Sequence, residues 1–176
     1  MRICVIQPYY SFDPADLQNC FDGLMEQLRK CDDSLDLIVL PDYSDVLADI
    51  HGEADFHSAI ERYNSALMAE AADTAVRCNA LVFVNAGHRT DTGWRNTTHV
   101  IGRDGEVIGR YYKAHPAPSE VRRGTDGGYG MDVSYSYSFD EPYTLDIEGV
   151  RYGFMTCYVF SREGRKCLVK IKIVAG

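Results

Sequence analysis

The first half of the chain alternates short apolar runs with stretches of helical periodicity. The apolar runs lie at residues 2–6, 35–40 and 80–86, and a longer amphipathic stretch separates each run from the next. Each run has the length and the apolar character of a strand that is buried on both faces. The order strand, helix, strand, helix, strand is typical of a sheet covered by helices. We therefore predict an α/β fold.

The two amphipathic stretches are predicted to be core-facing helices. The first follows Asp13 and Pro14, which suit an N-cap and a first-turn proline. The second is rich in alanine between residues 66 and 75, and alanine favours helix. In both stretches apolar residues recur at the helical repeat. These residues are Leu17, Phe21, Leu24, Met25 and Leu28 in the first, and Phe56, Ile60, Tyr63, Leu67, Ala71 and Ala75 in the second.

Two hairpins are predicted in the second half. Residues 95–101 pair with 106–112 across Asp104-Gly105, and residues 143–147 pair with 152–155 across Glu148-Gly149. The polar stretch between them, residues 119–140, is rich in Gly, Ser and Tyr and is predicted to be a long loop. At the end of the chain, residues 168–174 alternate apolar and basic side chains, which fits either an edge strand or a frayed end.

Charge and composition restrict the class of partner. The formal net charge is -8, which argues against binding of nucleic acid or of an anionic membrane. The beginning, MRICVIQPYY, lacks a signal peptide and a membrane-spanning segment, so a cytoplasmic protein is expected. The six cysteines and five histidines show no zinc-site spacing, and we predict no metal and no cofactor. Four cysteines are interpreted as small buried apolar residues, namely Cys4, Cys20, Cys31 and Cys78.

Three reactive side chains lie just past apolar runs, where α/β sheets gather their sites. Asp42 lies in LDLIVLPDYSD, Lys113 in GEVIGRYYKAHP and Cys157 in VRYGFMTCYVF. Each alone has an ordinary explanation, because such an acid often forms a turn, a lysine is usually solvated and a cysteine is usually part of the core. Only their combination and order carry a functional signal.

In this order the three residues resemble the Glu-Lys-Cys triad of the nitrilase superfamily of carbon-nitrogen hydrolases. Gln7-Pro8 after the first strand, the segment WRNTTHVIGRDGEVIGRYYKAHP at residues 94–116, and Glu120, seven residues beyond the lysine, also resemble the family pattern. The resemblance covers most of residues 1–158. It implies the four-layer α-β-β-α sandwich of the superfamily, here incomplete, and a homo-oligomer.

The resemblance also implies a role for each residue. Cys157 would attack an amide or nitrile carbon, and Asp42 would accept the thiol proton and later deliver it to the leaving nitrogen. Lys113 would favour the thiolate and stabilise the oxyanion together with the backbone N–H of Tyr158. Glu120 would orient the lysine and assist the water of deacylation. For Glu120 a loop surface acid remains the alternative.

The sequence departs from the family in two places. Asp42 stands where the family has glutamate, so its carboxylate is one methylene shorter and lies about 1.5 Å farther back, which can cost about a hundredfold in rate. The chain also ends nineteen residues after Cys157, where family members continue. We therefore predict the N-terminal part of a hydrolase domain in residues 1–161. Residues 162–176 form a divergent basic tail of net charge +4, against -12 for the remainder.

Two functions follow as hypotheses. The first is hydrolysis of a non-peptide carbon-nitrogen bond, in an amide or alternatively a nitrile, through a cysteine thioester, with activity impaired by truncation and by the shorter acid. The second is a non-catalytic remnant that binds a partner or self-associates through uncovered apolar sheet surface. The sequence does not identify the substrate.

Overall fold

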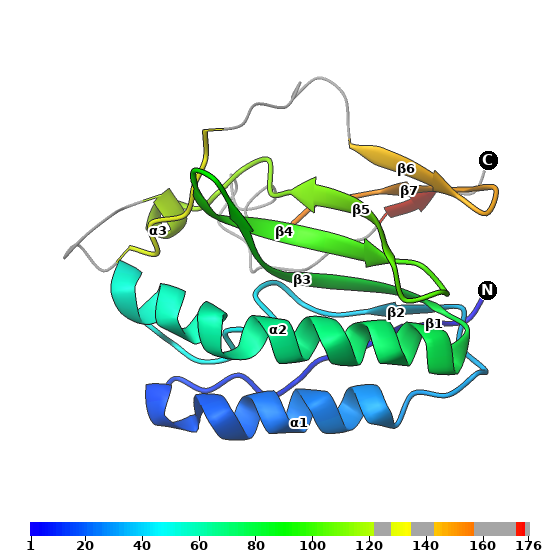
Figure 1. Ribbon diagram of the computed structural model, residues 1–176, viewed down its shortest axis with the longest axis horizontal. Coiled ribbons are helices and arrows are strands. Elements are labelled where there is room, and N and C mark those ends of the chain that lie inside the picture. The colour runs from blue at the N-terminus through cyan, green and yellow to red at the C-terminus, as the bar shows by residue number, and fades with distance from the viewer. Residues whose placement is uncertain (122–127, 135–142, 157–171, 175–176) are drawn as a thin grey trace.

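A five-stranded mixed sheet forms the middle of the molecule (Figure 1). The structure, a computed structural model, describes residues 1–121, 128–134, 143–156 and 172–174. The sheet has the order β1-β2-β3-β4-β5, with β1, β2 and β3 parallel and the pairs β3–β4 and β4–β5 antiparallel. Its strands are β1 (Ile3–Val5), β2 (Leu37–Val39), β3 (Leu81–Thr90), β4 (Gly93–Ile101) and β5 (Val107–Tyr112).

Two long helices cover one face of this sheet, as predicted. A 3-10 turn (Pro14–Asp16) leads into α1 (Leu17–Arg29), and the Asp13 side chain caps the turn by accepting a 2.9 Å hydrogen bond from the backbone N of Ala15. The second helix, α2 (Glu53–Cys78), packs beside α1 (Figure 1). The predicted apolar stripes of both helices are buried, and they build the larger core together with the helix-facing side chains of the strands, such as Ile38, Val82, Val84 and Ala86.

A second sheet lies on the opposite face (Figure 1). It contains β6 (Thr144–Ile147), β7 (Val150–Gly153) and β8 (Lys172–Val174), all antiparallel. Between the sheets lies a second apolar cluster, made of Leu37, Val39, Leu81, Phe83, Val100, Tyr111, Tyr152 and Phe154. The described residues therefore make up a helix layer, a sheet and a second sheet, which are three of the four predicted layers.

Both predicted hairpins are confirmed, as β4–β5 and β6–β7. Residues 172–174 pair with β7, which supports the edge-strand alternative for the tail. A third hairpin was not predicted, because β3 continues past its apolar run to Thr90 and pairs with β4 along its length. The polar side chains of Asn85, His88 and Arg89 end the apolar pattern before the strand itself ends.

Two further expectations need correction. The first strand was predicted to be buried, but the side chains of Ile3 and Val5 are 42% and 61% exposed, because the layer described over the neighbouring strands does not cover them. The predicted loop from residue 119 instead begins within a short helix, α3 (Pro118–Val121), which buries Glu120.

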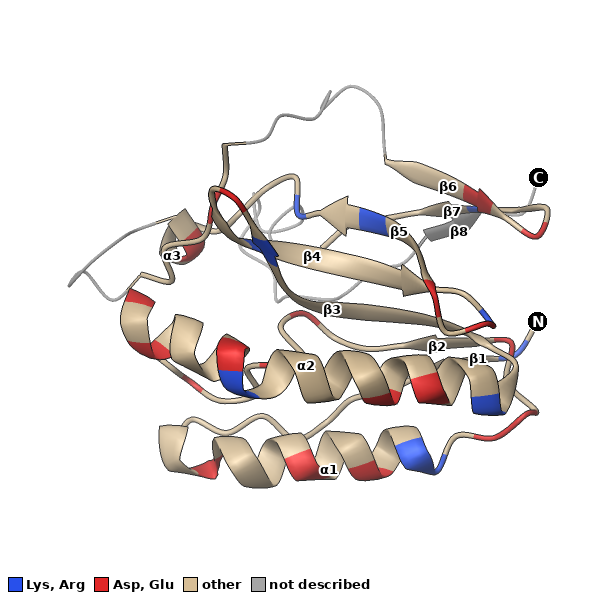
Figure 2. Cartoon of the chain, in the orientation of Figure 1, with Lys and Arg blue, Asp and Glu red and all other residues tan. Residues whose placement is uncertain are grey.

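Charged side chains lie on the outside of the helix layer. Figure 2 shows acidic residues spread along α1 and α2, and most of them are exposed. Of the four cysteines in the described ranges, Cys20, Cys31 and Cys78 are buried and Cys4 is partly buried, in agreement with their assignment to the core. None of the helices that the structure describes has both the length and the apolar character needed to cross a membrane.

Candidate active site

The loop after β2 carries Asp42 and is anchored three residues later. The carboxylate of Asp45 is fully buried and accepts hydrogen bonds from the backbone N of Gly87 (2.8 Å) and from Asn64 Nδ2 of α2 (2.9 Å). Between the two acids, Tyr43 adopts a φ of +50°, a left-handed conformation that non-glycine residues rarely take. This sharp turn directs Asp42 toward the end of β5 and Asp45 toward the helix layer.

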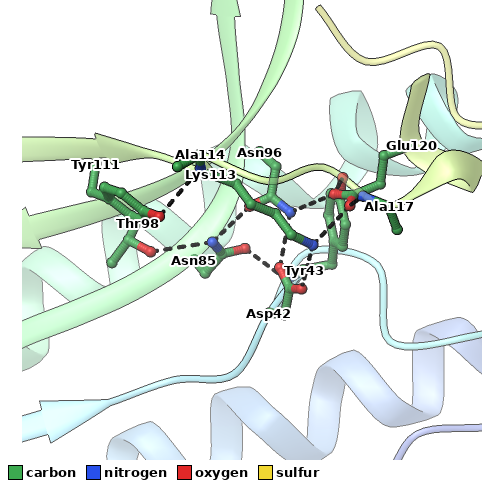
Figure 3. Close-up of polar contacts among 10 residues, drawn as sticks. All are labelled: Asp42, Tyr43, Asn85, Asn96, Thr98, Tyr111, Lys113, Ala114, Ala117 and Glu120. Carbon is green, nitrogen blue, oxygen red and sulfur yellow. Dashed lines mark hydrogen bonds and ion pairs between the residues drawn. The ribbon is translucent and has the colours of Figure 1, made fainter. Parts of the chain in front are cut away.

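Lys113 follows β5 directly and lies at the centre of a polar cluster (Figure 3). Its backbone N donates to the carbonyl oxygen of Asn96 at 3.0 Å. Its side chain is only 2% exposed, and Nζ lies 3.2 Å from Asp42 Oδ2 and 2.8 Å from Glu120 Oε2. An ammonium group so deeply buried needs charged partners, and the two carboxylates supply them.

Glu120 is held by donors from four parts of the chain. Besides Lys113, the hydroxyl of Tyr43 (2.7 Å) and Asn96 Nδ2 (2.8 Å) donate to Oε1, and the backbone N of Ala117 (2.5 Å) donates to Oε2. The carboxylate is 3% exposed. The alternative of a loop surface acid is therefore wrong, because every contact of Glu120 faces the interior.

Two asparagines belong to the polar cluster, and sequence reasoning missed both: Asn96 bonds both carboxylates, and Asn85 bonds Asn96 (Figure 3). Asn96 Nδ2 donates to Asp42 Oδ1 at 2.9 Å as well as to Glu120, while its Oδ1 accepts from Asn85 Nδ2 at 2.7 Å. Asn85 also accepts from the backbone N of Tyr43 at 2.8 Å and donates to Thr98 Oγ1 at 3.2 Å. An asparagine inside an otherwise apolar run, as Asn85 is in residues 80–86, was the available signal.

Burial governs the pKa values of Asp42 and Tyr43. Burial raises the pKa of its carboxyl group and the charge of Glu120 raises it further, while Lys113 and the hydrogen bond from Asn96 act in the opposite direction. For Tyr43, burial and the two nearby carboxylates hold the pKa well above its ordinary value, so its hydroxyl keeps its proton and remains a donor. A carboxyl group with a raised pKa can take up and release a proton nearer neutral pH.

Three of the predicted site residues thus converge, namely Asp42, Lys113 and Glu120. Cys157 and Tyr158 lie outside the described residues. Thr156, the residue before Cys157, lines a cavity of about 20 Å³ together with Asp42. In the part of the chain that the structure describes, no group of three or more His, Cys, Asp or Glu side chains is placed to hold a metal ion.

The sequence model of the family described as "Carbon-nitrogen hydrolase" matches residues 2–159. The chain belongs to this family. The match includes the strands β1 to β7, the helices and every residue of the polar cluster around Lys113. Comparison with curated proteins gives no match.

Solved structures support the fold of a carbon-nitrogen hydrolase. A carbon-nitrogen hydrolase from Helicobacter pylori G27 is 18% identical, with a TM-score of 0.61, and the match covers 90% of this chain and 52% of that one. A CN-hydrolase superfamily protein from Xanthomonas campestris with an arsenic adduct in its active site is 21% identical, with a TM-score of 0.55 and coverage of 90% and 54%. A mutant amidase from Nesterenkonia sp. AN1, with acrylamide added at its active-site cysteine, is 14% identical, with a TM-score of 0.56 and coverage of 90% and 57%. The chain therefore spans about half the length of these hydrolases.

Proposed function

We propose that the chain hydrolyses a non-peptide carbon-nitrogen bond through a thioester on Cys157. In this proposal Asp42 is the general base, Lys113 stabilises the thiolate and the oxyanion, Glu120 supports the lysine, and Tyr158 contributes its backbone N–H. The observation that carries the proposal is the buried ammonium group of Lys113, which lies within 3.2 Å of one carboxylate and 2.8 Å of another. Such a cluster is costly to bury, and sites of this kind are often catalytic.

The proposed first step is attack by sulfur on the carbonyl carbon. The thiol proton passes to Asp42, the sulfur–carbon bond forms, and the carbonyl oxygen becomes an oxyanion. Lys113 and the backbone N–H of Tyr158 would stabilise this oxyanion. Asp42 then protonates the leaving nitrogen as the carbon-nitrogen bond breaks, and water hydrolyses the thioester. The raised pKa of Asp42 suits both transfers.

Glu120 is assigned a positioning role in this scheme. Its carboxylate accepts from Lys113 Nζ at 2.8 Å and is itself fixed by Tyr43, Asn96 and Ala117. These donors fix the carboxylate of Glu120, and the fixed carboxylate holds the ammonium group of Lys113 in place. We also assign it assistance to the deacylating water.

For the substrate we propose an amide, with a nitrile as the alternative. The Nesterenkonia protein is described as an amidase with an active-site cysteine, which favours the amide. We expect slow turnover, because Asp42 stands where the family resemblance implies a longer glutamate.

A non-catalytic protein that self-associates is the second candidate. It is supported by Ile3 and Val5, whose apolar side chains are 42% and 61% exposed on the edge strand β1. Uncovered apolar surface beside a sheet edge promotes association between chains. In this case the polar cluster around Lys113 would have no catalytic role.

Thiol labelling separates the two candidates. Iodoacetamide is applied at graded pH, and labelled peptides are quantified by mass spectrometry. A thiolate stabilised by Lys113 should label at Cys157 below pH 7, well under the ordinary thiol pKa of about 8.5. Burial raises the pKa of Cys20, Cys31 and Cys78, that of Cys31 to about 11, so these thiols serve as slow internal controls.

Variants test whether the lysine causes this reactivity. Lys113→Gln should move the labelling of Cys157 to alkaline pH and lower amide hydrolysis by about 100-fold or more, the effect of losing one oxyanion donor. Lys30→Gln, a change of an exposed lysine, is the matched control and should alter neither measurement. Slow labelling of Cys157 at ordinary thiol pH, unaffected by Lys113→Gln, would favour the non-catalytic candidate.

A further inference from the structure

Asn96 of β4 contacts all three charged residues of the polar cluster (Figure 3). Its Nδ2 donates to Asp42 Oδ1 at 2.9 Å and to Glu120 Oε1 at 2.8 Å, and its backbone carbonyl oxygen accepts from the backbone N of Lys113 at 3.0 Å. Asn96 is itself buried, with 3% of its surface exposed. A neutral residue therefore fixes the placement of three charged ones.

The orientation of the Asn96 amide follows from a backbone donor. The backbone N of Tyr43 can only donate, so the side-chain atom of Asn85 that lies 2.8 Å from it is the oxygen. Asn85 Nδ2 then faces Asn96 and donates to its Oδ1 at 2.7 Å, which leaves Asn96 Nδ2 toward the carboxylates. Both protons of this Nδ2 are used, one for Asp42 and one for Glu120. A turned amide would place an oxygen against two carboxylates.

The two acids depend unequally on this amide. Within the described residues, Glu120 accepts from four donors, whereas Asp42 accepts only from Asn96 and Lys113. Hydrogen bonds donated to a carboxylate favour its ionised form. Without Asn96 the carboxylate of Glu120 would keep three donors and that of Asp42 would keep one. The effect of Asn96 should therefore fall mainly on Asp42.

We propose that Asn96 is a positioning residue that acts through Asp42, because its amide holds this carboxylate beside Lys113 and favours its ionised form. The use of Asp42 as a base rests on the proposed function. The bridge from Asn96 to the two carboxylates rests only on described residues. Asn96 itself is given no contact with the substrate.

The electrostatics of Asp42 indicate the direction of the effect. Burial raises the pKa of its carboxyl group, Lys113 and the bond from Asn96 lower it, and the charge of Glu120 raises it. Removing Asn96 takes away one lowering contribution, so the pKa of Asp42 should rise further. Other ionisable side chains among the described residues interact more weakly with the charge of Asp42, namely Tyr43, Asp45, Tyr111 and Tyr129.

Carbon-13 NMR of carboxyl-labelled aspartate tests the bridge without requiring activity. Asn96→Leu keeps the branched shape and removes the amide. The midpoint of the Asp42 titration should rise by about one pH unit, as expected for one hydrogen bond to a charged group. The signal of Asp45, which bonds Gly87 and Asn64 instead, is the control in the same spectra and should not move. An unchanged Asp42 midpoint, or equal shifts of both signals, would overturn the proposal.

A second measurement uses the original chain and does not depend on the folding of a variant. In protein labelled with nitrogen-15 asparagine, the Nδ2 protons of Asn96 should change chemical shift with the same midpoint as the Asp42 carboxyl group. The Nδ2 protons of Asn64, which bond Asp45, should follow the titration of Asp45 instead. An Asn96 amide that does not respond while Asp42 titrates would show that the bridge is absent.

The pH profile of amide hydrolysis tests the consequence for the proposed reaction. Asn96→Leu should lower kcat/KM about tenfold on the acid side of the profile and less than about threefold at alkaline pH, where Asp42 is ionised in both proteins. A uniform loss at every pH would indicate a purely structural Asn96 and refute the proposal. If the original chain hydrolyses no amide, the proposed function fails, while the two NMR titrations still decide whether Asn96 controls Asp42.

Discussion

The two faces of the five-stranded sheet are built differently. The face toward α1 and α2 is covered by apolar side chains from both helices and forms the larger core. The opposite face is divided: apolar residues such as Leu37 and Phe83 pack under β6 and β7, while Asn85, Asn96 and Lys113 gather where the strands lead into the site. One face is packed by apolar side chains, and the other combines such packing with the polar cluster around Lys113.

The loop after β2 joins the two faces. Asp42 lies on the face toward the second sheet, where it contacts Lys113 and Asn96. Asp45, three residues later, serves the helix side by binding Asn64 of α2. The helix layer therefore fixes the backbone of the loop that carries Asp42. Changes on the two faces should therefore have separable effects on stability and on activity.

The largest loss of stability is expected from Lys113→Met. The change leaves Asp42 and Glu120 buried without their shared cation, and breaking a buried charge pair in this way costs about 3–5 kcal/mol. Urea unfolding monitored by circular dichroism measures the loss. Adding Asp42→Asn and Glu120→Gln should recover much of it. Lys30→Met, at an exposed position, should leave the free energy of unfolding nearly unchanged. A stable Lys113→Met protein would show that the cluster is less closed than its contacts indicate.

A matched pair of truncations on β2 compares the faces directly. Ile38 and Leu37 are adjacent and fully buried, but Ile38 faces the helices and Leu37 faces the second sheet. Removing such side chains costs about 2–5 kcal/mol, and the cost falls where the surroundings can collapse into the space. We expect Ile38→Ala near the top of this range and Leu37→Ala near the bottom, because one hairpin can shift more readily than two packed helices. Equal losses in urea unfolding would contradict the comparison.

The sequence predicted the helix side better than the divided face. The helical repeat of Leu24, Leu28 and Leu67 depends only on the burial of one stripe, and that burial is confirmed. The exposure of Ile3 and Val5 could not be predicted, since an apolar run does not show which layers cover a strand.

The candidate site shows the same limit. The meeting of Asp42, Lys113 and Glu120 was expected from their order and from the family resemblance, and the three residues do meet. Asn96 lies within residues 94–116, a segment that resembles the family, but the sequence assigned it no role. One amide group can bridge two carboxylates only where the tertiary structure places both beside it, and the sequence does not show this.

The pH dependence of stability should reveal Asp45. Burial outweighs its hydrogen bonds and raises its pKa to about 6, from an ordinary value of 3.8. Between about pH 4 and pH 6 the folded protein therefore holds a proton that the unfolded chain has released, so the free energy of unfolding falls as the pH rises through this window. The free energy of unfolding falls by about 3 kcal/mol across this window, and the fall is complete above about pH 6. Asp45→Asn should flatten the profile in this window, measured by urea unfolding at each pH. An unchanged slope would show that Asp45 is ionised in the folded state.

The smallest effect on stability is expected at the uncovered end of the divided face. Ile3→Thr and Val5→Thr keep β-branched side chains and are largely exposed, so each should change the free energy of unfolding by less than about 0.5 kcal/mol. Both should nevertheless reduce self-association, measured by sedimentation velocity across concentrations, since they remove apolar surface beside a free sheet edge. Ile6→Thr is the matched control: its side chain faces the helix core and is 4% exposed, so it should destabilise the fold clearly. If Ile3→Thr and Val5→Thr destabilise the protein as strongly as Ile6→Thr, then a layer covers β1 in solution, and the two faces of the sheet are more alike than their contacts indicate.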